Sequence, residues 1–149
     1  MTEEPRVPVR FPLGPNECHG QSSESVWTES LDGKRFVVLN TPFFIKGVSF
    51  EDQISAVLGE DGYTFREVVG RGGHSTYRIV VKGGFAEASD ELARLEAMGC
   101  TWEDGPGDLL ALDVPPGADI EEVYASLEAG VDAGVWDFEE GHLGHAIAR

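Results

Sequence analysis

Residues 76–99, TYRIVVKGGFAEASDELARLEAMG, decide the fold, because their hydrophobic period changes part-way along. Tyr77, Ile79 and Val81 alternate as they would in a strand with one buried face. Apolar residues then recur at helical spacing, at Phe85, Ala88, Leu92 and Leu95. Gly99 follows them and is a suitable helix stop. The stretch therefore predicts a strand followed by a helix.

The chain after this helix predicts further strands and a second helix. Strands over 100–102 and 109–114 enclose a turn rich in glycine, and a strand over 135–139 comes last. Between them Asp119 can cap a helix, with Glu122 as its reciprocal partner. The apolar stripe of that helix is Ile120, Val123, Leu127 and Val131. The predicted order β-α-β-β-α-β is that of a ferredoxin-like unit.

The preceding part of the chain predicts strands alone. Strand formers over 26–31 and 34–39 flank Asp32-Gly33, a strong hairpin signal. Two further strands fit residues 53–58 and 63–69. Short strands joined by tight turns favour a small antiparallel β-barrel or curled sheet.

We therefore expect an α+β fold in three parts. Residues 1–24 are rich in proline and glycine and predict an extended or flexible leader, with Val7, Val9 and Phe11 lying against the body. Residues 25–72 are expected to form the small β subdomain, and residues 73–149 the ferredoxin-like subdomain.

The chain is strongly acidic, and its charge is unevenly distributed. Its 149 residues include 27 acids and 11 bases, a net charge of −16, and 41% of them are apolar. Residues 1–84 contain 11 acids and 9 bases, whereas residues 85–149 contain 16 acids and only Arg94 and Arg149 as bases. This balance argues against binding to nucleic acid or to an anionic membrane. The acidic second half can steer a basic partner, or it can simply keep the protein soluble.

The sequence also bears on location and redox state. No apolar run approaches the roughly 20 residues of a membrane span, and no signal peptide follows Met1, so we expect a cytoplasmic protein. In that compartment Cys18 and Cys100 are expected to be reduced. Cys100 has the surroundings of a small core residue, and Cys18 beside His19 is a weak signal for a thiol site.

Residues 70–78, GRGGHSTYR, are the candidate site. Their glycines let backbone amides turn toward a ligand, and their basic and hydroxyl side chains can bind a phosphate or carboxylate. The expected ligand-binding residues are Arg71, Gly72, Gly73, Thr76 and Arg78. The segment is not a phosphate-binding P-loop, because the Gly-Lys-Ser/Thr ending is absent.

The same segment offers acid–base chemistry. His74 can act as acid or base, with Ser75 and Glu139 as secondary catalytic candidates. Strand alternation places five polar residues on the open face of the predicted sheet, namely His74, Thr76, Arg78, Asp137 and Glu139. A structural interpretation fits them too: Arg78 pairs with Asp137 or Glu139, and His74 closes a contact with the β subdomain.

No cofactor and no metal are expected. His142 and His145 stand near two glutamates, and these residue types bind metals. However, Gly141 and Gly144 argue against a helix, and residues three apart in a strand face opposite ways. The sequence contains no Cys-x-x-Cys motif, dinucleotide fingerprint or nucleophile elbow.

Three stretches together resemble a bacterial family. They are Val26-Trp27 with its hairpin, Asn40-Thr41-Pro42-Phe43-Phe44 leading to Gly47-Val48-Ser49, and Gly73-His74-Ser75-Thr76-Tyr77-Arg78. The family is described only as a domain of unknown function, common in high-GC soil bacteria, and the resemblance covers about residues 25–145. It implies a small bacterial cytoplasmic protein and supplies no activity.

Two functions therefore stay open. The first is a non-enzymatic binding protein, of a regulatory or immunity type, whose acidic second half holds a basic protein. The second is a small enzyme or ligand sensor that binds an anionic substrate at residues 70–78, with His74 as acid or base. The exposed edges of the predicted sheet also allow a homodimer.

Overall fold

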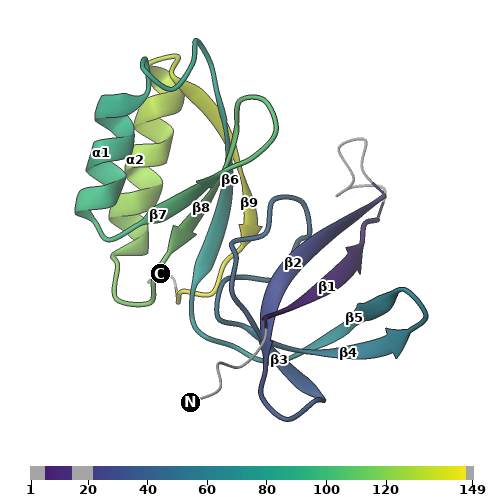
Figure 1. The fold of residues 1–149 in the computed structure, drawn as a ribbon. Coiled ribbons are helices and arrows are strands. Elements are labelled where there is room, and N and C mark those ends of the chain that lie inside the picture. Colours follow the sequence, from purple (N-terminus) through teal and green to yellow (C-terminus); the bar gives the residue numbers. More distant parts are fainter. Residues whose placement is uncertain (1–5, 15–21, 147–149) are drawn as a thin grey trace.

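The computed structural model describes residues 6–14 and 22–146. It contains two β-rich halves (Figure 1). The first half is a closed barrel in the strand order β1-β2-β3-β4-β5. Its strands are β1 (Arg6–Pro12), β2 (Ser23–Ser30), β3 (Arg35–Val38), β4 (Gln53–Gly59) and β5 (Gly62–Gly70).

Strand β1 shows that residues 6–12 of the expected leader are extended and belong to the barrel. It pairs antiparallel with β2 and parallel with β5, and the second pairing closes the barrel. Val9 and Phe11 are fully buried, whereas Pro8 and Pro12 occupy exposed alternate positions. Because β1 pairs with β5 over two residues only, the missing proline N–H groups are tolerated along this strand. Cys18 lies outside the described residues.

The barrel encloses a small apolar core. Phe11 stacks on Phe65 with 4.5 Å between ring centroids, and the ring of Phe36 lies 4.9 Å from that of Tyr63. The buried members of this core are Val9, Phe11, Val26, Phe36, Val38, Ile45, Val48 and Ile54. The expected curled sheet of short strands is therefore confirmed, with one parallel pairing added to it.

The second half combines a four-stranded sheet with two helices. Its elements are β6 (Ser75–Val81), α1 (Ser89–Ala97), β7 (Thr101–Asp104), β8 (Leu109–Val114), α2 (Ile120–Asp132) and β9 (Trp136–His142). The sheet order is β7-β8-β6-β9, and its three pairings are antiparallel. Strands β6 and β8 are therefore central. The two halves together confirm the α+β class.

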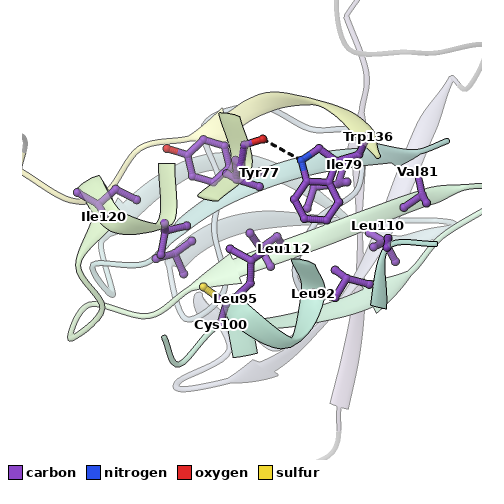
Figure 2. Close-up of a cluster of buried hydrophobic side chains, with 14 residues drawn as sticks. Tyr77, Ile79, Val81, Leu92, Leu95, Cys100, Leu110, Leu112, Ile120 and Trp136 are labelled. Carbon is purple, nitrogen blue, oxygen red and sulfur yellow. Dashed lines mark hydrogen bonds between the residues drawn. The ribbon is translucent and has the colours of Figure 1, made fainter. Parts of the chain in front are cut away.

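Both helices cover one face of this sheet, and the core lies between the two layers (Figures 1 and 2). Tyr77, Ile79 and Val81 are buried in this core, as their alternation predicts. Trp136 is fully buried as well, and its Nε1 donates a hydrogen bond to the Leu127 carbonyl oxygen at 2.9 Å. The helix-covered face of the sheet is therefore apolar.

Helix α2 packs closely against the sheet at Gly130. A Cβ atom there would lie 2.3 Å from the Trp136 ring, so only glycine fits. Val131 then turns outward and is 38% exposed, so its expected place in the apolar stripe is wrong. Asp119 caps the helix as expected, because its carboxylate accepts hydrogen bonds from first-turn backbone N–H groups. No helix among the described residues is long and apolar enough to cross a membrane.

Candidate functional site

The candidate segment lies where the barrel meets the open face of the sheet. It leaves the end of β5 and continues as β6. Ser49 Oγ and Thr76 Oγ1 are 2.6 Å apart, and both residues are fully buried. The Gly47 N–H donates to the Gly141 carbonyl oxygen at 2.9 Å. Thr76 therefore joins the two halves, and no solvent reaches it.

Arg71 is held by a buried carboxylate of the barrel. Its Nη1 lies 2.9 Å from Asp52 Oδ2 and also donates to the Gly47 carbonyl oxygen at 2.7 Å. Asp52 is fully buried and accepts the N–H groups of Ser49 at 2.8 Å and Gly72 at 3.1 Å. The Arg71 side chain is 48% exposed, but its charge is already matched at this point.

The two glycines of the segment serve a close backbone approach. A Cβ atom at Gly72 would lie 2.8 Å from the Glu51 carbonyl oxygen, and Gly73 has a φ of +89°. Glu51 itself has a φ of 67°, which is uncommon for a residue with a side chain. The glycines therefore allow the segment to pass Glu51, and their backbone geometry is used in joining the halves.

His74 is enclosed between two carboxylates. Its Nδ1 lies 2.9 Å and 3.0 Å from the two Asp113 oxygens, and its Nε2 lies 3.1 Å from Glu51 Oε2. The residue is 6% exposed, and its ring meets Phe50 edge-on. A neutral imidazole has one N–H donor and can serve one carboxylate, whereas an imidazolium serves both. Burial raises the pKa of Asp113 to about 6, and His74 opposes this rise.

Ser75 is paired with a histidine from the C-terminal segment. Its Oγ lies 2.6 Å from His145 Nδ1, while His145 Nε2 lies 2.8 Å from the Pro115 carbonyl oxygen. The Pro115 carbonyl oxygen can only accept, so the neutral His145 ring carries its hydrogen on Nε2. Its Nδ1 therefore accepts a hydrogen bond from the Ser75 hydroxyl group. The same Oγ accepts the N–H groups of Gly144 at 2.9 Å and His145 at 3.3 Å. Ser75 is fully buried, so these bonds fasten the C-terminal segment and give no support to a nucleophile.

Arg78 is the buried cation of the junction. It is 2% exposed, and its Nε donates to Glu139 Oε1 at 2.7 Å. Its Nη1 donates to the carbonyl oxygens of Phe43 at 2.9 Å and Ile45 at 3.5 Å. Its Nη2 is buried and has no hydrogen-bond partner among the described residues.

The barrel loop that meets Arg78 is itself shaped by a carboxylate. Glu24 is buried, and its two oxygens accept the N–H groups of Phe43 at 2.5 Å, Phe44 at 2.9 Å and Ile45 at 3.0 Å. With their N–H groups turned to Glu24, Phe43 and Ile45 present carbonyl oxygens to the guanidinium. One network of hydrogen bonds therefore runs from Glu24 through the barrel loop to Arg78 and on to Glu139.

The structure brings the expected site residues together in part. Arg78 meets Glu139, but Asp137 pairs with Lys82 at 3.3 Å, and both of these side chains are exposed. His74 meets Asp113 and a barrel residue instead of the β9 carboxylates. These contacts correspond to the structural interpretation of the segment.

Several partners were missed by the sequence analysis. They are Glu24, Glu51, Asp52 and Asp113. Asp113 left a signal, because it is a lone carboxylate in the otherwise apolar strand LLALDV. The barrel carboxylates left none, since the contacts of Glu24, Glu51 and Asp52 depend on how the folded chain packs.

The two C-terminal histidines diverge. His142 Nε2 lies 3.3 Å from Arg71 Nη1, whereas His145 contacts Ser75. Burial, and then Arg71, lower the pKa of His142. Within residues 6–14 and 22–146 no group of three histidines, cysteines or carboxylates could hold a metal ion. Cys100 is a buried free thiol, and burial raises its pKa to about 11.

A cleft of about 540 Å³ opens beside Arg78 on the barrel-facing side of the sheet. We call it the junction groove. Its lining includes Phe44 from the barrel loop and Arg78, Val80, Leu109, Asp137 and Glu139 from the sheet. It therefore combines apolar surface with carboxylates at one boundary of the two halves.

Most of the chain matches the model of a defined protein family. Residues 24–138 match the model of the domain of unknown function DUF4265. The chain belongs to this family. The match spans the barrel from β2 onward and the sheet as far as β9, so the DUF4265 chain includes both sides of the junction. The resemblance to a bacterial family of unknown function is confirmed at this level.

The fold has a counterpart among solved structures. The crystal structure of a hypothetical protein from Neisseria gonorrhoeae is similar, with a TM-score of 0.81 and 17% sequence identity. The similarity covers 97% of this chain and 100% of that chain. At this identity the likeness shows a shared fold. No curated protein matches the chain.

Proposed function

We propose that this DUF4265 chain is a non-enzymatic binding protein, of a regulatory or immunity type, that holds a basic protein in the cytoplasm. The observation that carries the proposal is the burial of His74 and Arg78 against carboxylates at the junction. A side chain that takes part in catalysis must reach the substrate. Here the donors of His74 point to Asp113 and Glu51, and the Nε donor of Arg78 points to Glu139. The segment thus builds the scaffold, and binding falls to the outer surface.

The charge of that surface supports a basic partner. Exposed carboxylates occur on both helices and on the turns and strands beside them. They are Glu87, Asp90, Glu96, Asp104, Asp108, Asp119, Glu121, Glu122, Glu128, Asp132, Asp137 and Glu140. Arg94 is the one exposed base in residues 85–146. Such a surface accelerates encounter with a positively charged protein and disfavours nucleic acid.

The fold is compatible with this role without deciding it. We infer that the second half is a ferredoxin-like unit, since its sheet order β7-β8-β6-β9 has the first and third strands of the unit in the centre. Folds of this kind carry many unrelated functions. The alternative, a small enzyme or sensor with an anion at residues 70–78, has less support. The residues that would hold the anion, Arg71, His74 and Arg78, already face Asp52, Asp113 and Glu139.

The test is capture of a partner followed by kinetics. The purified chain serves as bait in a lysate of the source bacterium, and a protein captured in stoichiometric amount is purified. Its association rate is then measured at rising NaCl concentration. We expect the rate to fall by about tenfold or more, because salt screens the steering field. A rate indifferent to salt would contradict the proposal.

Matched variants locate the charge. Glu121→Gln, Glu122→Gln and Glu128→Gln together remove three exposed charges from α2 and should lower the association rate. The control removes three exposed charges from the barrel hairpin, at Glu60, Asp61 and Glu67. Equal effects of the two variants would show attraction to net charge without a preferred face.

A further inference from the structure

The junction groove has an apolar wall that the fold leaves open. Val80 is 50% exposed although it lies on a central strand of the sheet. Leu109 is its register partner on β8, so the two side chains share one face. Phe44 approaches this face from the barrel loop. An apolar side chain of a partner can bury surface against these three residues.

The edge of the groove is acidic. Asp108 and Asp137 are exposed, and Glu139 lines the groove beside Arg78. Lys82 is near Asp137 but is itself 54% exposed. A lysine or arginine entering at this edge would gain charge-assisted hydrogen bonds. A carboxylate or phosphate would be repelled by the same groups.

Arg78 lines the groove without offering it a free donor. Its Nε is paired with Glu139, and its Nη2 is buried and has no hydrogen-bond partner among the described residues. The groove can therefore recognise a partner through its apolar wall and its acidic edge.

We propose that the junction groove is the docking site for an extended segment of the basic partner, in which an apolar side chain stands beside a lysine or arginine. The apolar side chain packs on Phe44, Val80 and Leu109. The basic side chain meets Asp108 and Asp137 at the edge of the groove. This inference rests on the proposed function and assigns it a site.

The experiment uses the full chain and short synthetic peptides. The probe is an acetylated and amidated peptide of alternating leucine and lysine. One comparison peptide replaces lysine with glutamate, and another replaces leucine with serine. Binding is followed by the backbone amide shifts of the ¹⁵N-labelled chain. We expect the leucine–lysine peptide to bind most tightly and to shift amides of β6 and β8 around Val80 and Leu109.

Paired variants separate the groove from the general acidic surface. Val80→Trp fills the groove, and Val131→Trp makes the same change at an exposed valine of α2. Asp137→Asn removes a groove charge, and Asp132→Asn removes one charge from α2. We expect Val80→Trp to weaken binding by about tenfold or more and Asp137→Asn to weaken it by several-fold. The α2 variants should have smaller effects.

Each outcome decides one of the two proposals. If the leucine–lysine peptide binds and the two variants of each pair weaken binding equally, the junction groove is not the docking site. The proposal of a basic partner then stands. If the serine peptide binds as well as the leucine peptide, the apolar wall has no role and the groove is wrong too. If the glutamate peptide binds as well as the lysine peptide, both the groove and the preference for a basic partner are overturned. If no peptide binds, the groove is overturned, and the salt-dependence test decides the function alone.

Discussion

The two faces of the β6–β9 sheet are built by opposite means. The helix-covered face carries Tyr77, Ile79 and Trp136 in a dry core, whereas the barrel-covered face carries Thr76 and Arg78 in hydrogen bonds and ion pairs. Apolar burial is non-directional and tolerates small shifts, but charge-assisted bonds require defined positions. The comparison teaches that the helical layer supplies stability, while the polar layer fixes the barrel against the sheet.

The largest effect is expected on the apolar face. Trp136→Ala should lower the free energy of unfolding by about 3–5 kcal/mol, because it removes a fully buried ring beside Gly130 and leaves a cavity. Urea denaturation followed by fluorescence or circular dichroism measures this loss. Val131→Ala at an exposed position of α2 is the control and should change little. A loss below about 1 kcal/mol for Trp136→Ala would mean that this core is not the main source of stability.

The next effect breaks the polar face. His74→Ala should cost about 2–4 kcal/mol at neutral pH, because it leaves the Asp113 carboxylate buried without its partner. The same urea titration measures it. Adding Asp113→Asn to His74→Ala should recover part of the loss, since the uncompensated charge is removed. Strictly additive losses would show that the two side chains are not coupled.

A third prediction sharpens the contrast through pH. The pKa of Asp113 is about 6, above its ordinary 3.8, because the carboxyl is buried. The folded chain therefore binds this proton more tightly than the unfolded chain. Stability contributed by the protonated group is present below about pH 4 and is lost as pH rises through about 6. Relative to Asp113→Asn, the wild type should lose about 2–3 kcal/mol over this window.

The measurement is the free energy of unfolding of both proteins at several pH values from 4 to 7. The asparagine variant keeps a neutral side chain at every pH, so the difference between the curves reports on Asp113. Parallel curves would show that the carboxyl titrates near its ordinary range. The Trp136 side chain itself has no group that ionises in this window, so Trp136→Ala should shift the wild-type curve without changing its shape.

The two faces also differ in how far sequence predicts them. Period-two and helical patterns predict the buried positions of Ile79, Leu92 and Leu127, because burial there follows from the period alone. The same alternation places Arg78 and Glu139 on one face. It does not identify Asp113 and Glu51 as the partners of His74, since those contacts depend on how the barrel packs.

Two local details depend on tertiary packing. Prolines in residues 6–12 predict an extended or flexible leader, and the strand formed there needs few of its N–H groups for pairing with β5. Val131 fits the apolar stripe of α2 by spacing. In the structure Gly130 packs against Trp136 and Val131 is exposed, so Val131 does not belong to the buried stripe. The contact between Gly130 and Trp136 is a property of tertiary packing.

The smallest effect is confined to the helical layer. Asp119→Ala should lower the free energy of unfolding by about 1 kcal/mol, because the carboxylate accepts the N–H groups of Glu121 at 3.0 Å and Glu122 at 3.3 Å. Asp132→Ala at the other end of α2 is the control, and removing an acid there should be neutral or slightly stabilising. In both variants the ring resonances of His74 should stay in place, because the cap lies on the helix side of the sheet. A shift of those resonances with Asp119→Ala would show that the two faces are coupled through β8 and α2, and the separation of their roles would then fail.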